Sequence, residues 1–148
     1  MLKVAGDVDF DGANGGRWSF GPDASLETLG SGGALQSFEV AGRNLGFVAA
    51  GFTNDNFYLP ELVIGPDGRL VLRDQRDNGN QSAGVSEALY VDKLVFSDSL
   101  GLIYLNGVDL YYNQLVGSEA QIVPEPATLL YVALGLVALV YRARARAR

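Results

Sequence analysis

The chain has 148 residues, of which 48% are hydrophobic and 19% are charged, a composition typical of a folded domain rather than a disordered one. It contains no cysteine and no histidine, which excludes disulfides, thiolate or imidazole metal ligands, and nucleophilic sites built on either residue. The formal net charge of −6 argues against a nucleic-acid partner, because nucleic acids are bound through clustered basic residues.

The first candidate site is an acidic segment near the start of the chain. The sequence DVDFDG places Asp7, Asp9 and Asp11 at alternate positions before a glycine, as in the opening of a calcium loop. An EF-hand-type loop also supplies a bidentate acid at its twelfth position, where this chain has Trp18. We therefore expect no resident cofactor and a solvated acidic turn, with calcium bound by the three aspartates as the alternative.

Four segments share a strand-turn-strand pattern. Residues 61–73 show it best, as an apolar run, a Pro-Asp-Gly turn and an alternating apolar run. The pattern recurs in residues 93–105, in shorter form in 114–123, and weakly in 28–40. The leading leucines of these segments are Leu29, Leu62, Leu94 and Leu115, at steps of 33, 32 and 21 residues.

These repeats predict an all-β body over residues 1–123. One unit cannot bury its own apolar face, so stacked units would form the end of a β-solenoid, similar to a right-handed parallel β-helix. Asn106 and Asn113 would lie at its corners, where asparagine tolerates left-handed backbone geometry. The alternative is a β-sandwich or roll made of unrelated hairpins.

The polar segment 73–80 is expected to be a surface excursion from this body. A carbohydrate-binding patch is the alternative, because its Asp, Asn and Gln side chains and nearby tyrosines could bond or stack on sugars. Tyr111 and Tyr112 would point to opposite faces of a strand, so they do not form a stacking platform by themselves.

No arrangement of residues indicates an enzyme. A Gly-x-Ser-x-Gly nucleophile motif and a glycine-rich phosphate loop with its lysine are both missing from the sequence. Two carboxylates can suffice for glycoside hydrolysis, but none of the acidic residues stands in a recognisable pair. We expect a protein without catalytic residues.

The last 25 residues differ from the body in charge and hydrophobicity. Residues 1–123 carry 7 basic and 16 acidic side chains, a net charge of −9, whereas residues 124–148 carry 4 and 1, a net charge of +3. The linker Pro124-Glu125-Pro126 precedes residues 127–141, which are uncharged and apolar on every helical face. Four arginines follow at alternate positions: Arg142, Arg144, Arg146 and Arg148.

Residues 127–141 are predicted to form a transmembrane helix. Such a helix would be about 22 Å long, which is short for a hydrocarbon core of about 30 Å but workable with local thinning and snorkelling arginines. The basic residues 142–148 would stay in the cytoplasm and leave the acidic body outside. The alternative is a buried helix of a soluble domain.

The order of Pro-Glu-Pro, a short apolar helix and a basic end resembles the PEP-CTERM protein-sorting signal of Gram-negative bacteria. The resemblance covers Val123 to Arg148 and departs from the family in that its arginines alternate with alanines. It implies export, anchoring in the inner membrane, processing by an exosortase, and a final location at the cell surface or in the extracellular matrix. Pro124, Glu125 and Pro126 would be the sorting motif, and Arg142 to Arg148 would retain the helix.

A second resemblance concerns the body. Residues 88–112 resemble the closing turns of passenger-like β-solenoid regions in large bacterial surface proteins. This resemblance, and a start at Met1 without an apolar signal segment, lead us to expect a fragment of a longer repeat protein. We therefore expect a non-enzymatic exported surface protein; the alternative is a calcium- or polysaccharide-binding module displayed by the same signal.

Overall fold

The computed structural model describes residues 1–9, 20–30, 32–76 and 84–124. They form a strand-rich body of two sheets, in which all neighbouring strands are parallel. The first sheet has the order β1 (Leu2–Val4), β2 (Ser25–Thr28), β4 (Leu59–Ile64), β6 (Ala88–Phe96) and β8 (Asp109–Val116). The second has the order β3 (Leu35–Glu39), β5 (Arg69–Arg73), β7 (Leu102–Tyr104) and β9 (Ile122–Val123). The short 3₁₀ helices are η1 (Ala49–Gly51), η2 (Asn54–Asn56) and η3 (Glu119–Gln121).

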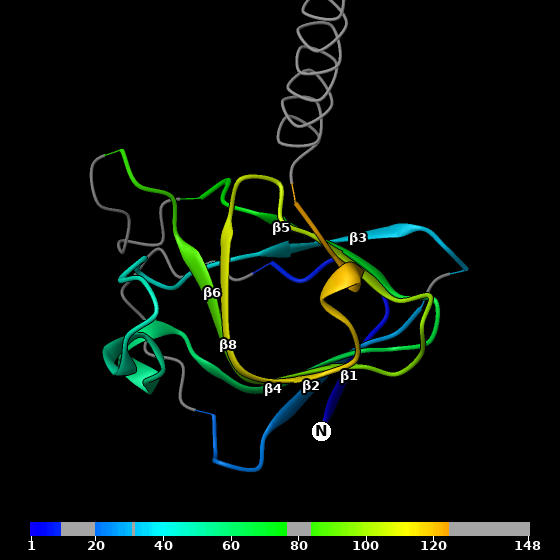
Figure 1. Cartoon of the computed structure of the whole chain (residues 1–148), viewed down its shortest axis with the longest axis horizontal. Coiled ribbons are helices and arrows are strands. Elements are labelled where there is room, and N and C mark those ends of the chain that lie inside the picture. The colour runs from blue at the N-terminus through cyan, green and yellow to red at the C-terminus, as the bar shows by residue number, and fades with distance from the viewer. Residues whose placement is uncertain (10–19, 31, 77–83, 125–148) are drawn as a thin grey trace, which may run out of the picture.

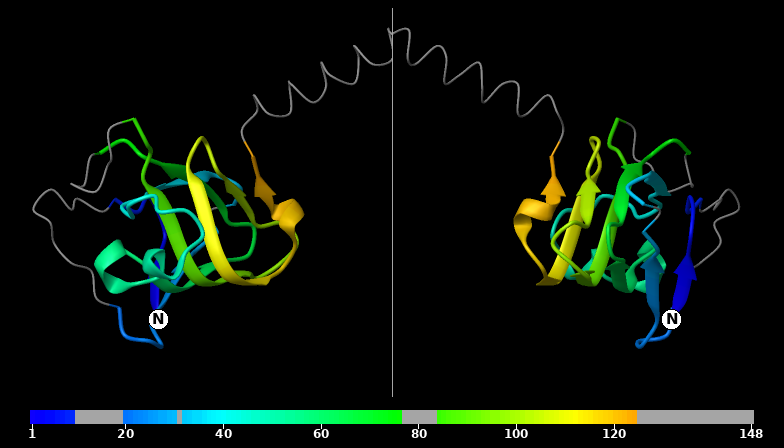
Figure 2. Two further views of the ribbon diagram at one scale, coloured as in Figure 1. Left: turned by 60° about the vertical axis from the view of Figure 1, so that its left-hand side comes forward. Right: turned by 90° about the vertical axis from the view of Figure 1, so that its right-hand side faces the viewer.

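The chain alternates between the two sheets. From β2 onward, each strand of the first sheet is followed by a strand of the second, and each return adds a strand beside the previous one. Successive strands therefore stack side by side (Figures 1 and 2). The predicted strand-rich fold is confirmed, but the two strands of each predicted unit lie in different sheets and do not pair as hairpins. Within the described ranges, the one antiparallel bridge joins Gly42 to Ala88.

The predicted leucine alignment is confirmed at three positions and wrong at the fourth. Leu62 pairs with Leu94, and Leu94 pairs with Leu115. On β2, however, the partner of Leu62 is Leu26 and not Leu29. Leu26 is only 2% exposed and points into the core, whereas Leu29 follows the end of β2 at the turn.

The core lies where the inward faces of the two sheets meet. Along β6 the buried inward side chains are those of Leu89, Val91, Leu94 and Phe96. The alternation therefore shifts by one position at Asp92, beside which Asn113 of β8 donates from Nδ2 to Asp92 Oδ1 at 2.8 Å. Asn106 lies in the turn before β8 with a left-handed φ of 49°, as the sequence predicts for a corner.

Side chains hold together the turns that lead from the first sheet to the second. In the turn after β6, Asp98 Oδ1 accepts bonds from the N–H groups of Leu100 and Gly101, and its Oδ2 accepts one from Asp67. Desolvation acts to raise the pKa of Asp98, but these three donors together hold it below the ordinary value of an aspartate. Gln121, in the next turn, donates from Nε2 to the carbonyl groups of Asp98 and Gly101.

Two other contacts restrict substitutions at these turns. A Cβ atom added at Gly30 would overlap the carbonyl oxygen of Pro66. The hydroxyl of Tyr112 donates to the Glu119 carboxylate. Burial, followed by that bond and the carboxylate charge, raises the pKa of Tyr112 to about 12.

The connections that lead back from the second sheet to the first vary in length. They comprise residues 40–58 after β3, 74–87 after β5 and 105–108 after β7. The strand register is continuous across them, so these connections account for the irregular steps between repeats. The longest connection, the 40–58 loop, contains η1 and η2 and forms most of the site described below.

Among residues 1–9, 20–30, 32–76 and 84–124, no helix has the length and apolar character needed to cross a membrane. The predicted helix over residues 127–141 and the arginines after it lie outside the described residues.

Candidate functional site

The 40–58 loop packs against the outer face of the first sheet, across β6 and β8. Gly42 exchanges main-chain hydrogen bonds with Ala88 at the start of β6. Asn44 reaches β8, where its Nδ2 donates to Asp109 Oδ2 at 2.8 Å and its Oδ1 accepts from the Tyr111 hydroxyl at 3.1 Å. The loop is therefore tied to two neighbouring strands of the sheet.

Two buried polar side chains fix the path of the loop. The hydroxyl of Tyr90, a fully buried residue, accepts from the N–H of Leu45 at 2.8 Å and donates to the carbonyl of Gly46 at 3.1 Å. Asn56 accepts from the N–H of Arg43 at 2.8 Å and donates to the carbonyl of the same residue at 3.2 Å. Because buried polar groups are costly to leave unpaired, these bonds favour one loop conformation.

Five aromatic rings meet where the loop covers the sheet. Phe47, Phe52 and Tyr58 come from the loop or its end, Tyr90 from β6 and Tyr111 from β8. Tyr90 and Tyr111 are paired across the strands and stack with centroids 4.9 Å apart. The edge-on ring of Phe52 lies 5.3 Å from Tyr90 and 5.5 Å from Phe47. We call these five side chains the aromatic cluster.

Glycine is required for this contact at one position. A Cβ atom added at Gly51 would overlap the ring of Tyr90. The main chain of η1 thus lies directly against the ring of Tyr90.

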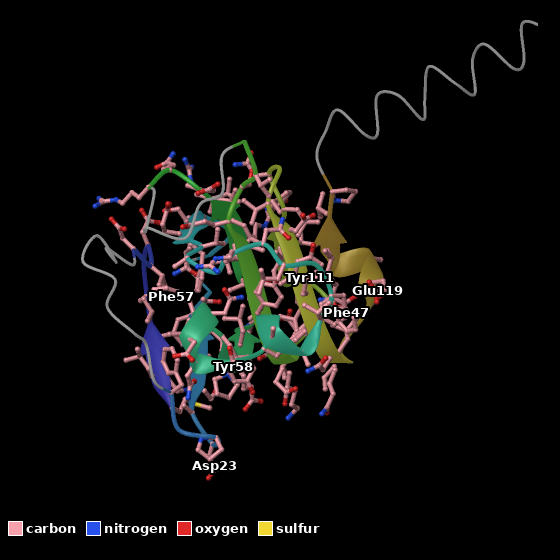
Figure 3. The ribbon with its side chains drawn as sticks, turned by 90° about the vertical axis from the view of Figure 1, so that its left-hand side faces the viewer. Asp23, Phe47, Phe57, Tyr58, Tyr111 and Glu119 are labelled. Atoms are coloured by element: carbon pink, nitrogen blue, oxygen red, sulfur yellow. The ribbon has the colours of Figure 1, made fainter. Side chains whose placement is uncertain are left out.

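Part of the aromatic cluster is open to solvent. Phe47 is 63% exposed, and the neighbouring apolar side chains of Leu45 and Val48 are also exposed. Figure 3 faces this side of the molecule and shows Phe47 and Tyr111 close together, with Tyr58 nearer to Asp23. Exposed apolar side chains that lie beside an aromatic-lined pocket are a common feature of binding sites.

A shallow pocket of about 280 Å³ adjoins the aromatic cluster. It lies between the 40–58 loop, the segment before β2 and the start of β4, and is lined by Phe20, Pro22, Phe52, Thr53, Asn54, Tyr58 and Pro60. Burial raises the pKa of Tyr58, and the charge of Asp92 raises it further. The phenol is therefore neutral at physiological pH and can donate a hydrogen bond.

The predicted calcium residues Asp7 and Asp9 contact protein groups instead. The N–H of Ser37 donates to Asp7 Oδ1 at 2.7 Å and is the main cause of a lowered pKa of Asp7. Asp9 forms an ion pair with Arg76 at 2.8 Å. No cluster of three or more metal-ligating side chains occurs in the described part of the chain, and Asp11 lies outside it. Calcium binding by the three aspartates therefore stays a prediction.

The described part of the predicted polar loop, residues 73–76, is fixed by acidic side chains. Glu39 Oε1 accepts from the N–H groups of Gln75 and Arg76, both at 2.7 Å. Asp74 Oδ2 accepts from the N–H of Glu87 at 3.0 Å. Residues 77–80 lie outside the described residues, so the predicted surface excursion and its sugar-binding alternative are not tested.

Of the predicted sorting motif, the structure describes only Pro124. It is exposed and directly follows β9. Glu125 and Pro126 lie outside the described residues, as do Arg142, Arg144, Arg146 and Arg148.

The aromatic cluster was missed at the sequence level. The prediction that Tyr111 and Tyr112 point to opposite faces is confirmed, since Tyr111 joins the cluster and Tyr112 packs against the core. The stacking partner of Tyr111 is Tyr90, on another strand. The frequent aromatic residues in the 40–58 loop were the available signal.

Comparison with protein families, with curated proteins and with solved structures gives no match for the chain. Function is therefore inferred from the residues of the chain itself.

Proposed function

We propose that the chain is a non-enzymatic exported protein of the cell surface or extracellular matrix of a Gram-negative bacterium. The observation that carries this proposal is the order of Pro124-Glu125-Pro126, the uncharged residues 127–141 and the arginines of residues 142–148. In this proposal the apolar residues hold the chain in the inner membrane during export. An exosortase-type enzyme then processes it at the Pro-Glu-Pro motif.

The position of the motif relative to the body supports this proposal. Strand β9 ends at Val123, and the exposed Pro124 follows immediately. From the sequence, the two prolines of the motif are expected to disfavour helix and to favour an extended linker between the body and residues 127–141. The four arginines directly after residues 127–141 agree with a cytoplasmic tail, because Lys and Arg beside a membrane helix tend to stay on the cytoplasmic side.

We further propose that the body is the end of a β-solenoid, similar to a right-handed parallel β-helix. Two observations support this description over a sandwich or roll built from hairpins. All neighbouring strands are parallel, and consecutive strands alternate between the sheets while each sheet grows by one strand at a time. Hairpins would instead place consecutive strands side by side and antiparallel.

The second candidate is a polysaccharide- or calcium-binding module displayed by the same signal. The aromatic cluster favours the polysaccharide branch. The calcium branch predicts that calcium at about a hundred times its dissociation constant raises the unfolding free energy by about 2.7 kcal/mol. An unfolding midpoint that does not change with calcium would exclude it.

Mass spectrometry of the C-terminal peptide, from membrane and extracellular fractions of the native cells, tests the proposal. A chain that ends within residues 124–128, outside the inner membrane, is the expected result. A full-length chain in the membrane would show that residues 127–141 are an unprocessed anchor and would contradict processing by an exosortase. A full-length soluble chain would contradict the membrane anchor as well. Glu125→Ala should prevent processing, whereas Asp23→Ala, at an exposed carboxylate of the body, should not.

A further inference from the structure

We infer that the aromatic cluster and the adjoining pocket form a binding site for an uncharged polysaccharide. This inference rests on the proposed function, because it names the ligand class of the proposed matrix protein. The site comprises the exposed ring of Phe47 and the pocket lined by Phe52 and Tyr58.

The chemistry of the site matches that of a sugar ring. A sugar presents a face of C–H bonds and an edge of hydroxyl groups. The C–H face, which carries partial positive charge, stacks on the negative face of an aromatic ring. The pocket wall contains Phe52 and Tyr58, and the exposed side chains of Thr53 and Asn54 can exchange hydrogen bonds with the hydroxyls. A volume of about 280 Å³ is small for a ligand pocket and suits one ring of a longer chain.

The charges around the site favour an uncharged ligand. Asp109 accepts from Asn44, which in turn accepts from the Tyr111 hydroxyl, so this carboxylate lies beside the aromatic cluster. The charge of Asp92 raises the pKa of Tyr58 at the pocket. The body as a whole carries a net charge of −9 over residues 1–123. An anionic polysaccharide would be repelled by this field.

The site is also preorganised. The Tyr90 hydroxyl and the Asn56 side chain hold the loop in place, and Gly51 lets its main chain approach the ring of Tyr90. Binding would therefore immobilise few side chains, which reduces the entropy cost of association. A second copy of the chain is the competing occupant, and the experiment distinguishes it.

The test uses the full chain in a nonionic detergent without a sugar headgroup. Calorimetry measures its binding to dextran, hydroxyethylcellulose and galactomannan, which are uncharged, and to anionic alginate. The variants are Phe47→Ala and Tyr58→Ala. The matched control is Leu100→Ala, because Leu100 is 60% exposed, as Phe47 is 63% exposed, but lies in the turn after β6. Thermal unfolding verifies that each variant is folded.

We expect binding to at least one uncharged polysaccharide, with affinity about two- to tenfold weaker in each aromatic variant and unchanged in the control. Binding to none of the three, binding only to alginate, or equal binding by all variants would overturn the inference. If the chain binds no polysaccharide but self-associates, and Phe47→Ala abolishes this self-association, the aromatic cluster is a contact between two copies of the chain and the inference is wrong. If the chain is exported but binds no polysaccharide, only the binding-site inference is contradicted. If the chain binds polysaccharide but is not processed at its C-terminus, only the proposed sorting is contradicted.

Discussion

Replacement of Leu26 by alanine, compared with the same change at Leu29, tests the register of the first sheet. Leu26 is 2% exposed, belongs to the core and pairs with Leu62 of β4, whereas Leu29 is half-buried and lies outside the core cluster. Leucine-to-alanine changes in cores cost about 2–5 kcal/mol. The neighbour of Leu26 on β1 is Leu2, which is 58% exposed, so the cavity that the alanine substitution would create lies close to solvent.

We therefore expect Leu26→Ala to lower the free energy of unfolding by about 2–3 kcal/mol, in the lower half of the range. Leu29→Ala should cost about 1 kcal/mol or less, because only part of its side chain leaves water on folding. Urea unfolding followed by circular dichroism measures both, and an unchanged urea dependence shows that the same surface is exposed on unfolding. Equal costs, or a greater cost at Leu29, would refute the register and favour the alignment predicted from the leucine spacing alone.

Three further predictions concern the turns between the sheets. Gly30→Ala should cost about 3 kcal/mol in urea unfolding, since the added methyl would overlap the Pro66 carbonyl, whereas Gly21→Ala, with open space around it, should be neutral. The folded-state pKa of Tyr112 is raised to about 12 from the ordinary tyrosine value near 10, so wild-type stability should fall as pH rises from 10 towards 12. Because the pKa values of Tyr58, Tyr90 and Tyr111 are raised too, Tyr112→Phe should weaken this dependence in alkaline unfolding without abolishing it. Because the pKa of Asp98 is lower in the folded state, its ionised carboxylate stabilises the fold above the ordinary aspartate pKa, and this stability is lost as pH falls through the folded-state pKa. The midpoint of thermal unfolding should therefore fall less on acidification for Asp98→Asn than for the wild type. An equal fall in both proteins would contradict this.

The strands could be predicted because their signals are local. Alternating apolar residues around Pro66-Asp67-Gly68 mark β4 and β5, and the same pattern marks β6 and β7. The error at Leu29 has a physical cause. Residues 28–40 contain a glycine-rich turn that resembles the later turns, but β2 begins before that segment, at Ser25.

The aromatic cluster could not be predicted in the same way, because it depends on contacts between distant segments. Tyr90 and Tyr111 meet only through the register of β6 and β8. Phe47 and Phe52 lie in a loop with no strand or helix period, so no sequence pattern says which face they cover. The calcium prediction rested on spacing alone, which does not reveal that Asp9 is close enough to pair with Arg76.

The connections that lead back from the second sheet to the first differ in length, which indicates that insertions there cost little folding free energy. Doubling the length of a flexible loop raises its closure cost by only about 0.6 kcal/mol, and the parallel strand pairing is the same before and after each connection. The 40–58 loop and the connection over residues 105–108 thus differ several-fold in length on the same framework. Evolution or protein engineering can therefore replace the loops at this side, and with them the proposed binding surface, without redesigning the core.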